Sequence, residues 1–282
     1  MKDLFNGGVA IVTGGASGIG RALATALAER GATVAIADIS LDDAKDAAAA
    51  IGQGAHAYHC DVTDIVSVAA LADAVTRDFG GVHFVFANAG VLVMGSLHET
   101  DPKEFQWVFD VNVRGTFNTV HAFLPLLLAQ AAQGRSAKFV ITGSENSVGL
   151  PFQGVMTAYT ATKHALLAMA DGLRRDMEDK GVDVAIVCPG AVNTRLWDAR
   201  RARQENYGGN APILGDEAAQ WAKAFGNMVH PSVTARICLD GVEEGEFVII
   251  TDHKIRAIAE KRHGEVAAAL DRLDARLKDS AS

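Results

Sequence analysis

The chain has 282 residues, of which 49% are hydrophobic and 21% are charged, and its formal net charge is -8. This composition predicts a globular protein with one large core and excludes a disordered chain. The acidic balance argues against a nucleic-acid-binding protein, because such proteins carry a basic surface.

Cysteine usage and the N-terminal residues bear on the compartment. Cys60, Cys188 and Cys238 lie far apart and form no Cys-x-x-Cys pair, so we expect no metal site and a reducing environment. No signal-peptide pattern opens the chain. No apolar run reaches the roughly 18 residues that a membrane span needs. We therefore expect a cytoplasmic protein without a membrane partner.

Strand and helix patterns alternate along the chain. Helices are expected at residues 19–30, 41–51, 64–79 and 157–180, with two more within 102–133. Strands are expected at residues 8–13, 33–38, 55–60, 82–87, 138–142, 182–188 and 247–251. This alternation predicts an α/β fold of the Rossmann type, a doubly wound parallel sheet of about seven strands with helices on both faces.

Two stretches depart from the alternation. Residues 195–230 form a long polar insertion, and residues 254–277 have a charged helical pattern that extends the C-terminus. No linker divides the chain, so residues 1–282 are expected to form a single dinucleotide-binding and catalytic domain.

A glycine-rich turn follows the first expected strand, with the sequence Thr13-Gly14-Gly15-Ala16-Ser17-Gly18-Ile19-Gly20. Glycines let the backbone turn sharply and approach a pyrophosphate, and the helix that follows offers unpaired N–H groups at its N-terminus. A plain strand–helix turn is the alternative. The strand–turn–helix context favours dinucleotide binding.

Asp38 ends the second expected strand, 18 residues after Gly20. A carboxylate at this point can accept hydrogen bonds from the adenosine ribose and would repel a 2′-phosphate. Asp38 could instead cap the next helix, but Ser40 is available for that role. No Arg or Lys adjoins Asp38, and Ser17 occupies a position where a basic residue would favour NADP. The pattern predicts NAD as the cofactor.

Tyr159 and Lys163 are four residues apart in an expected helix and so share one face. A nearby ammonium lowers the pKa of a tyrosine from its ordinary value of about 10. Such a pair can move a proton to or from an alcohol oxygen. A solvated helix face is the alternative for an isolated Tyr-x-x-x-Lys pattern.

Together these residues resemble the short-chain dehydrogenase/reductase family over about residues 9–251. The pieces that match, in order, are Thr13 to Gly20, Asp61-Val62, Asn88-Ala89-Gly90, Asn112, a serine before Gly149, Tyr159 to Lys163, and Pro189-Gly190 followed by Thr194. Each piece is weak alone. Their shared order and spacing make the resemblance specific.

The resemblance implies roles for these positions. Asn112 would anchor a water that relays protons to Lys163, and Lys163 would hold the nicotinamide ribose and lower the tyrosine pKa. The catalytic set is Asn112, Ser144, Tyr159 and Lys163. The cofactor-binding set is Gly14, Ser17, Gly18, Ile19, Gly20, Asp38, Asp61, Val62, Asn88, Ala89, Gly90, Tyr159, Lys163, Pro189, Gly190, Val192 and Thr194.

The catalytic serine has two candidates. The family distance from this serine to the tyrosine is about 13 residues, whereas Ser144 lies 15 residues before Tyr159 and Ser147 lies 12 before it. Ser144 directly follows the strand end, so a two-residue insertion after it explains the spacing. We favour Ser144 and keep Ser147 as the alternative.

The implied reaction is the interconversion of a secondary alcohol and a ketone with NAD, with Tyr159 as acid/base. The alternatives are an NADP-dependent carbonyl reductase of the same family, a nucleotide-sugar epimerase or dehydratase, and a regulator that only binds NAD. The epimerase or dehydratase fits less well, because the glycine motif of those enzymes has a different spacing. The regulator also fits less well, because such proteins often lack the tyrosine or the lysine.

An apolar or aromatic substrate is expected from the candidate pocket walls, which are residues 91–97, residues 150–152, Trp197, Tyr207, Trp221 and Phe225. The arginines of the insertion could meet a carboxylate, but we expect them to form a solvated helix face: Arg195, Arg200, Arg201 and Arg203. The family resemblance also implies a homotetramer or a homodimer.

Overall fold

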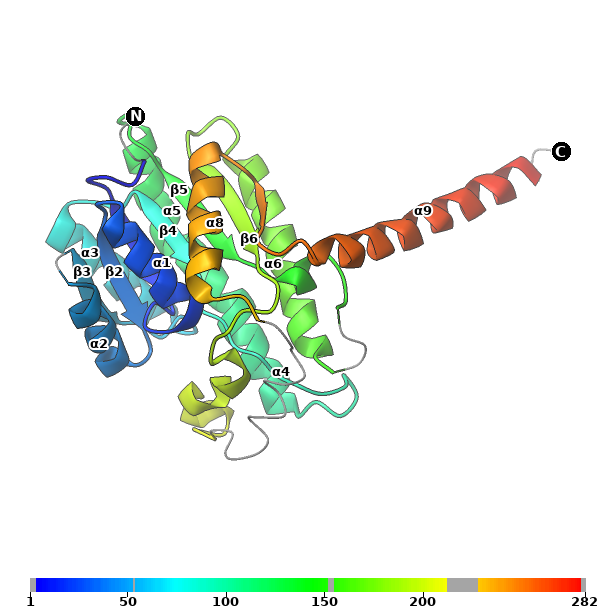
Figure 1. The fold of residues 1–282 in the computed structure, drawn as a ribbon, viewed down its shortest axis with the longest axis horizontal. Helices are drawn as coiled ribbons and strands as arrows, with labels where there is room; N and C mark the ends of the chain where they lie inside the picture. Colours follow the sequence, from blue (N-terminus) through cyan, green and yellow to red (C-terminus); the bar gives the residue numbers. More distant parts are fainter. Residues whose placement is uncertain (1–3, 53, 152–154, 212–227, 280–282) are drawn as a thin grey trace.

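The computed structural model describes residues 4–52, 54–151, 155–211 and 228–279. Its strands are β1 (Val9–Thr13), β2 (Thr33–Asp38), β3 (Ala55–His59), β4 (Phe84–Ala87), β5 (Lys138–Thr142), β6 (Asp183–Cys188) and β7 (Val248–Ile250). Its long helices are α1 (Gly18–Glu29), α2 (Leu41–Ile51), α3 (Ile65–Phe79), α4 (Pro102–Phe109), α5 (Gly115–Ala131), α6 (Thr157–Asp176), α8 (Pro231–Glu244) and α9 (Ile255–Asp279). Figure 1 shows their arrangement.

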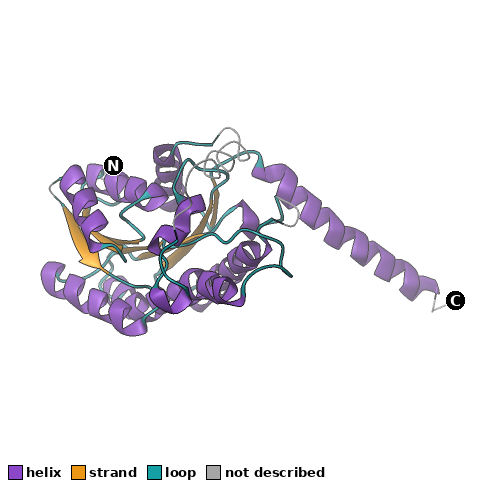
Figure 2. Ribbon diagram, turned by 90° about the horizontal axis from the view of Figure 1, so that it is seen from below, coloured by secondary structure: helices purple, strands orange, loops and turns teal. Residues whose placement is uncertain are grey.

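The strands form one parallel sheet of seven strands in the order β3-β2-β1-β4-β5-β6-β7. Helices cover both faces of the sheet, as seen from below in Figure 2. The predicted Rossmann-type fold is therefore confirmed. Parallel strands need crossover connections, and the helices between the strands provide them.

Alternation along each strand builds two cores. Val9 and Ile11 of β1 point into a core that is shared with α3, α5 and α6, whereas Ala10 and Val12 point into a second core with α1, α2 and α8. Successive side chains of a strand face opposite sides of the sheet. Burial on both sides explains why the strands are apolar throughout.

The expected helix pair at residues 102–133 contains a feature that the sequence pattern did not indicate. Between α4 and α5 the chain makes a π-helical turn, Asp110–Arg114. Turns of this kind are rare and concentrate at functional sites. Asn112 lies in this turn, fully buried, and bonds to Val91 in the segment that follows β4.

The described parts of the insertion and of the C-terminal extension are helical. Two 3-10 turns, η3 (Leu196–Ala202) and η4 (Glu205–Tyr207), follow β6. Residues 212–227 of the insertion lie outside the described residues. Helix α9 projects from the body in Figures 1 and 2, and of its residues Ile255 alone is buried. Across the described residues, no helix combines the length and the apolar character that a membrane crossing requires.

Candidate active site

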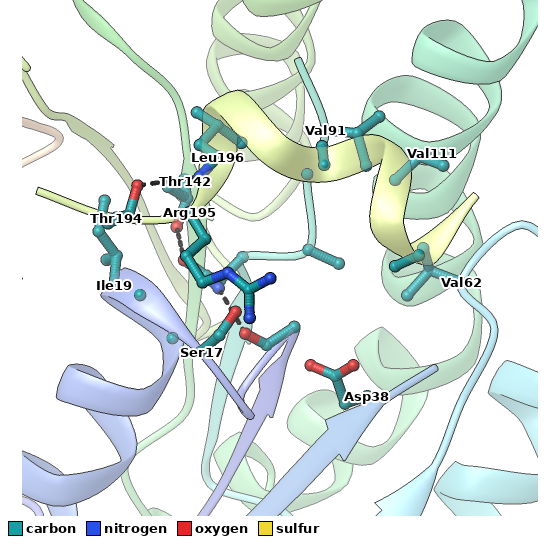
Figure 3. Close-up of a pocket in the computed structure, with 18 of the residues that line it drawn as sticks. Ser17, Ile19, Asp38, Val62, Val91, Val111, Thr142, Thr194, Arg195 and Leu196 are labelled. Atoms are coloured by element: carbon teal, nitrogen blue, oxygen red, sulfur yellow. Dashed lines mark hydrogen bonds between the residues drawn. The ribbon is translucent and has the colours of Figure 1, made fainter. Parts of the chain in front are cut away.

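A cavity lies where the carboxyl ends of β1, β2, β4, β5 and β6 meet (Figure 3). Open parallel sheets bind ligands at this edge. Every residue of the predicted cofactor-binding set lines this cavity, and so does Ser144. The fold therefore brings together residues as far apart as Gly14 and Thr194. Asn112 is the one member of the predicted catalytic set that does not line it.

The glycine-rich turn is shaped for close approach of backbone to backbone. Gly14 and Gly18 have positive φ angles of 61° and 54°, which glycine adopts without strain. A Cβ on Gly20 would lie 2.2 Å from the carbonyl oxygen of Gly14. Ser17 precedes α1 and makes no side-chain capping bond, so the N–H groups of the first turn remain available for an anion. The cradle fits a dinucleotide pyrophosphate.

Asp38 is held at the end of β2 by two backbone groups. Its Oδ2 accepts a hydrogen bond from the N–H of Ala16, and its Oδ1 accepts one from the N–H of Ser40, each at 3.1 Å. Burial raises the pKa of Asp38. Ser40 caps α2 by accepting from the N–H of Asp43. Asp38 does not have to cap that helix and is available to a ligand.

The charge of a distant arginine acts on Asp38. Its sequence neighbours include no cation, but the fold brings Arg201 of η3 to the same end of the cavity. The charge of Arg201 acts on the Asp38 carboxyl and lowers its pKa against the larger effect of burial. Figure 3 shows the segment that begins with Arg195 and Leu196 passing over Asp38 and Ser17.

Asp61 has a partner that the sequence did not suggest. The side-chain amide of Gln204 donates to both carboxylate oxygens of Asp61, each at 3.1 Å. The side-chain Oε1 of Gln204 in turn accepts a hydrogen bond from Nε1 of Trp107 at 3.1 Å. The insertion therefore reaches the edge of the cavity at which the family resemblance puts the adenine. A residue 143 positions away from Asp61 has no local signal for this contact.

Tyr159 and Lys163 lie on the buried face of α6 and line the cavity together. The Lys163 Nζ lies 5.6 Å from the centre of the Tyr159 ring and donates to the carbonyl oxygen of Thr142 at 2.9 Å. This carbonyl belongs to the last residue of β5. The strand end and the helix thereby hold the ammonium beside the tyrosine.

The protonation equilibria of the pair are governed by burial. Burial raises the pKa of Tyr159, and a hydrogen bond with the Ser144 hydroxyl opposes this increase. Burial also lowers the pKa of Lys163 to about 8. The expected lowering of the Tyr159 pKa is thus not found, because desolvation disfavours the phenolate more than the surrounding groups stabilise it.

Asn112 is fully buried just outside the cavity lining, and its side chain is bonded on three sides. Its Nδ2 donates to the carbonyl oxygen of Val91 and to Oγ1 of Thr162, each at 3.0 Å, and its Oδ1 accepts from the N–H of Val91 at 2.8 Å. These bonds tie the π-helical turn to the chain after β4 and to α6. The side chain positions the elements that carry Tyr159 and Lys163.

Ser144 and Ser147 occupy unequal positions. Ser144 lines both the main cavity and a smaller adjoining pocket, together with Tyr159. Ser147 lines neither of them and is 1% exposed. Its hydroxyl packs 2.8 Å from the point where a Cβ on Gly143 would lie. The geometry therefore supports Ser144 as the serine that faces a substrate.

The smaller pocket is mostly apolar. Besides Ser144 and Tyr159 it is lined by Leu92, Glu145, Asn146, Met156, Gly190, Ala191, Val192, Thr194, Leu196, Trp197 and Met228. Glu145 is the sole carboxylate among these lining residues. Burial, with a contribution from Asp252, raises the pKa of Glu145 to about 7, and Lys254 opposes this shift.

Several expected pocket walls lie elsewhere. Tyr207 is buried away from the pocket and donates to Oδ2 of Asp110 at 2.7 Å. Leu97 and Leu150 are 55% and 42% exposed. Of the expected walls, Phe152, Trp221 and Phe225 are outside the described residues. Trp197 does line the pocket.

The arginines of the insertion do not form the expected solvated face. Arg200 and Arg203 both pair with Glu104, at 2.7 Å and 2.9 Å. These bonds anchor η3 on α4. Arg195 alone fits the expectation, with its side chain 63% exposed beside Asp198.

Comparison with known proteins agrees with the geometry of the site. The family model for short chain dehydrogenases matches residues 8–205. The chain belongs to the short-chain dehydrogenase/reductase family. Its members are oxidoreductases, and the site described above lies within the matched region except for a few residues beyond its end.

Individual relatives cover most of the chain. A galactitol 2-dehydrogenase of Agrobacterium fabrum is 32% identical over 220 residues, which are 78% of this chain and 83% of that protein. A C alpha-dehydrogenase of a Sphingobium species is 30% identical over 93% of this chain and 85% of that protein. A short-chain dehydrogenase/reductase from Burkholderia phymatum, solved in complex with NAD, has a TM-score of 0.86 and 30% identity, with 94% of this chain and 96% of that chain covered.

Proposed function

We propose that this protein is an NAD-dependent dehydrogenase that interconverts a secondary alcohol and a ketone. The observation that carries the proposal is the convergence of Ser144, Tyr159 and Lys163 in one cavity with the glycine-rich turn and Asp38. Acid/base and cofactor-binding groups are thus adjacent, as hydride transfer requires.

The site fits a nicotinamide dinucleotide. Gly14 and Gly20 pack too closely against Ala89, Asn88 and each other to carry a side chain, and both line the cavity at the turn that would hold the pyrophosphate. Asp38 would accept hydrogen bonds from the adenosine ribose, Asp61 and Val62 would meet the adenine, and Val192 and Thr194 would hold the carboxamide. When bound, the cofactor supplies the hydride acceptor. The relative solved with NAD supports this choice.

The chain's own residues then handle the proton. Tyr159 as phenolate would take the hydroxyl proton of the alcohol, while the Ser144 hydroxyl would donate a hydrogen bond to the substrate oxygen. The ammonium of Lys163, held by the Thr142 carbonyl, would stabilise the phenolate before it accepts that proton. Asn112 would keep α6 in register with the end of β4.

The pocket supports an apolar or aromatic substrate. Trp197, Leu196 and Met156 supply large apolar surfaces near Tyr159. The Sphingobium relative is named for oxidation at an alpha carbon, and the Agrobacterium relative for a sugar alcohol, so secondary alcohols of both kinds belong in a screen. We further propose a cytoplasmic homotetramer or homodimer, and three buried free cysteines are in keeping with a reducing compartment.

A screen for NADH formation over secondary alcohols that differ in bulk and charge tests the proposal. A substrate should be oxidised by the wild type, and Tyr159→Phe should lower turnover at least ~100-fold while it retains NAD binding. Thr157→Ser, at the start of the same helix, is the matched control. Near-normal turnover in Tyr159→Phe would contradict the assignment of the acid/base.

An NADP-dependent carbonyl reductase of the same family is the second candidate. The specific observation in its favour is Arg201, a cation that lines the same cavity as Asp38 and could attract a 2′-phosphate. Assaying each alcohol with NAD and NADP, and each ketone with NADH and NADPH, separates the two candidates.

A further inference from the structure

Arg201 stands at the adenosine end of the cavity although it comes from the insertion. It lines the cavity together with Ser17 and Asp38. Its Nη2 lies 3.5 Å from Oγ of Ser17, a residue 184 positions earlier in the chain. Position 17 is where a basic side chain would favour NADP. Arg201 therefore places in space the positive charge that the glycine-rich turn lacks in sequence.

The guanidinium of Arg201 is oriented by backbone. Its Nη1 donates to the carbonyl oxygens of Arg195 at 2.9 Å and Asp198 at 3.0 Å. These bonds close the turn of η3 and leave Nη2 directed toward Ser17. An arginine held in this way loses little conformational entropy when it binds an anion.

Arg201 differs from its neighbours Arg200 and Arg203 in its ion pairing. In the part of the chain that the structure describes, no carboxylate oxygen lies within 4.0 Å of its guanidinium nitrogens, whereas Arg200 and Arg203 both pair with Glu104. Asp198, Asp38 and Asp43 attract Arg201 from beyond that distance, and Arg195 repels it. Arg201 thus lines the cavity together with Asp38, the carboxylate that would hold the ribose.

We infer that Arg201 is a specificity-determining residue of the adenosine pocket, which binds the 2′-phosphate of NADP and thereby offsets the repulsion from Asp38. The inference rests on the proposed function, since it concerns the cofactor of that same site. It replaces the expectation of a strict preference for NAD with that of an enzyme that also accepts NADP. The insertion then contributes to cofactor choice as well as to the substrate pocket.

Titration of protein fluorescence with NADH and NADPH, without substrate, tests the inference in wild type, Arg201→Gln, Arg201→Lys and Arg200→Gln. The wild type should bind both dinucleotides. Arg201→Gln should weaken NADPH at least ~10-fold more than NADH, the effect of removing a charge-assisted hydrogen bond. Arg201→Lys should retain part of the NADPH affinity. Arg200→Gln, the matched control next in sequence, should leave the ratio of the two dissociation constants unchanged.

Three results would overturn the inference. Equal weakening of both dinucleotides by Arg201→Gln would mean that the side chain binds the shared pyrophosphate. If Arg200→Gln changed the ratio of the two dissociation constants as much as Arg201→Gln does, η3 would act only through its packing. Thermal melts of each variant measure whether that packing is disturbed. A wild type that binds NADH alone would remove the role altogether. Failure of the proposed function looks different, because it is binding of either dinucleotide without oxidation of any alcohol.

Discussion

The hydroxyl of Ser147 accepts a hydrogen bond from the backbone N–H of Ser144, 3.1 Å away. The Ser144 hydroxyl in turn accepts from the N–H of Asn146 at 3.2 Å, so the two serines close a reciprocal capping box around the 3-10 turn Glu145–Ser147. The box commits Ser147 to the backbone. It leaves the Ser144 hydroxyl at the cavity, beside Tyr159.

Replacing each serine separately should therefore give two different defects. Ser144→Ala should lower kcat/KM about 10–1000-fold, because it removes a hydrogen bond to the substrate oxygen. Ser147→Ala should lower the free energy of unfolding by about 1–3 kcal/mol, because it leaves the buried N–H of Ser144 unsatisfied. Steady-state kinetics and urea denaturation of both variants measure these effects. A variant Ser147→Ala that is stable but inactive would reverse the assignment.

Glu145 should affect the pH dependence of catalysis. Its negative charge contributes to the raised pKa of Tyr159. Glu145→Gln should therefore lower the apparent pKa that governs alcohol oxidation, by about 0.5 unit or ~0.7 kcal/mol. The measurement is the profile of kcat/KM against pH, with Glu178→Gln on the surface as the matched control. An unchanged profile in Glu145→Gln would remove this electrostatic link.

The same substitution should change stability with a defined sign. Burial, the largest cause, raises the pKa of Glu145 from 4.5 to about 7 in the folded state. The folded protein then binds this proton more tightly than the unfolded chain does, so the residue costs stability increasingly as the pH rises from about 4.5 to about 7. The Tm of Glu145→Gln relative to wild type should rise from pH 5 to pH 8. A difference that is constant over this range would contradict the shift.

Gly20→Ala should impair dinucleotide binding. The added methyl would lie 2.2 Å from the Gly14 carbonyl oxygen and 2.5 Å from Nδ2 of Asn88, so the turn has to move. We expect NADH affinity to fall at least ~10-fold, the effect of about 1.4 kcal/mol of strain. Gly172→Ala is the matched control, because a Cβ there meets no atom within 4 Å and alanine favours a helix by up to about 1 kcal/mol.

The assembly should be larger than the chain mass of 29.6 kDa. Phe105 of α4 and Phe117 of α5 are 39% and 52% exposed, and large apolar side chains on the body of the protein favour burial in a subunit interface. Light scattering at micromolar concentration should give a multiple of the chain mass, and Phe117→Asp should lower it. Leu273→Asp on the projecting helix α9 is the comparison. A monomeric wild type would contradict the prediction.

The sequence predicted those features that depend on neighbouring residues. Strand and helix positions follow from local apolar periodicity, and Tyr159 and Lys163 share a face because they are one helical turn apart. The glycine-rich turn and the end of β2 meet because β1 and β2 are adjacent and parallel, so that their carboxyl ends lie at the same edge. These rules place Gly14, Asp38 and Asn88 at one edge without knowledge of any distant contact.

Contacts made by the insertion could not be predicted in the same way. Arg201 lies in the short 3-10 turn η3 and Gln204 directly precedes η4, and no periodicity in this segment indicates which way a side chain points. Their partners Ser17 and Asp61 are 184 and 143 positions away. The π-helical turn that carries Asn112 also has no sequence period of its own. The expected lowering of the Tyr159 pKa was wrong because burial depends on the whole packed structure.

The strand order has a consequence for how the chain is made. After β1, each strand pairs with the current edge of the sheet: β2 and β3 add on one side, and β4 to β7 add in turn on the other. No strand has to be inserted between two that are already paired. As the polypeptide leaves the ribosome, the strand with which each new strand pairs has already been synthesised. The sheet can therefore grow in the direction of translation, with each strand added to a free edge.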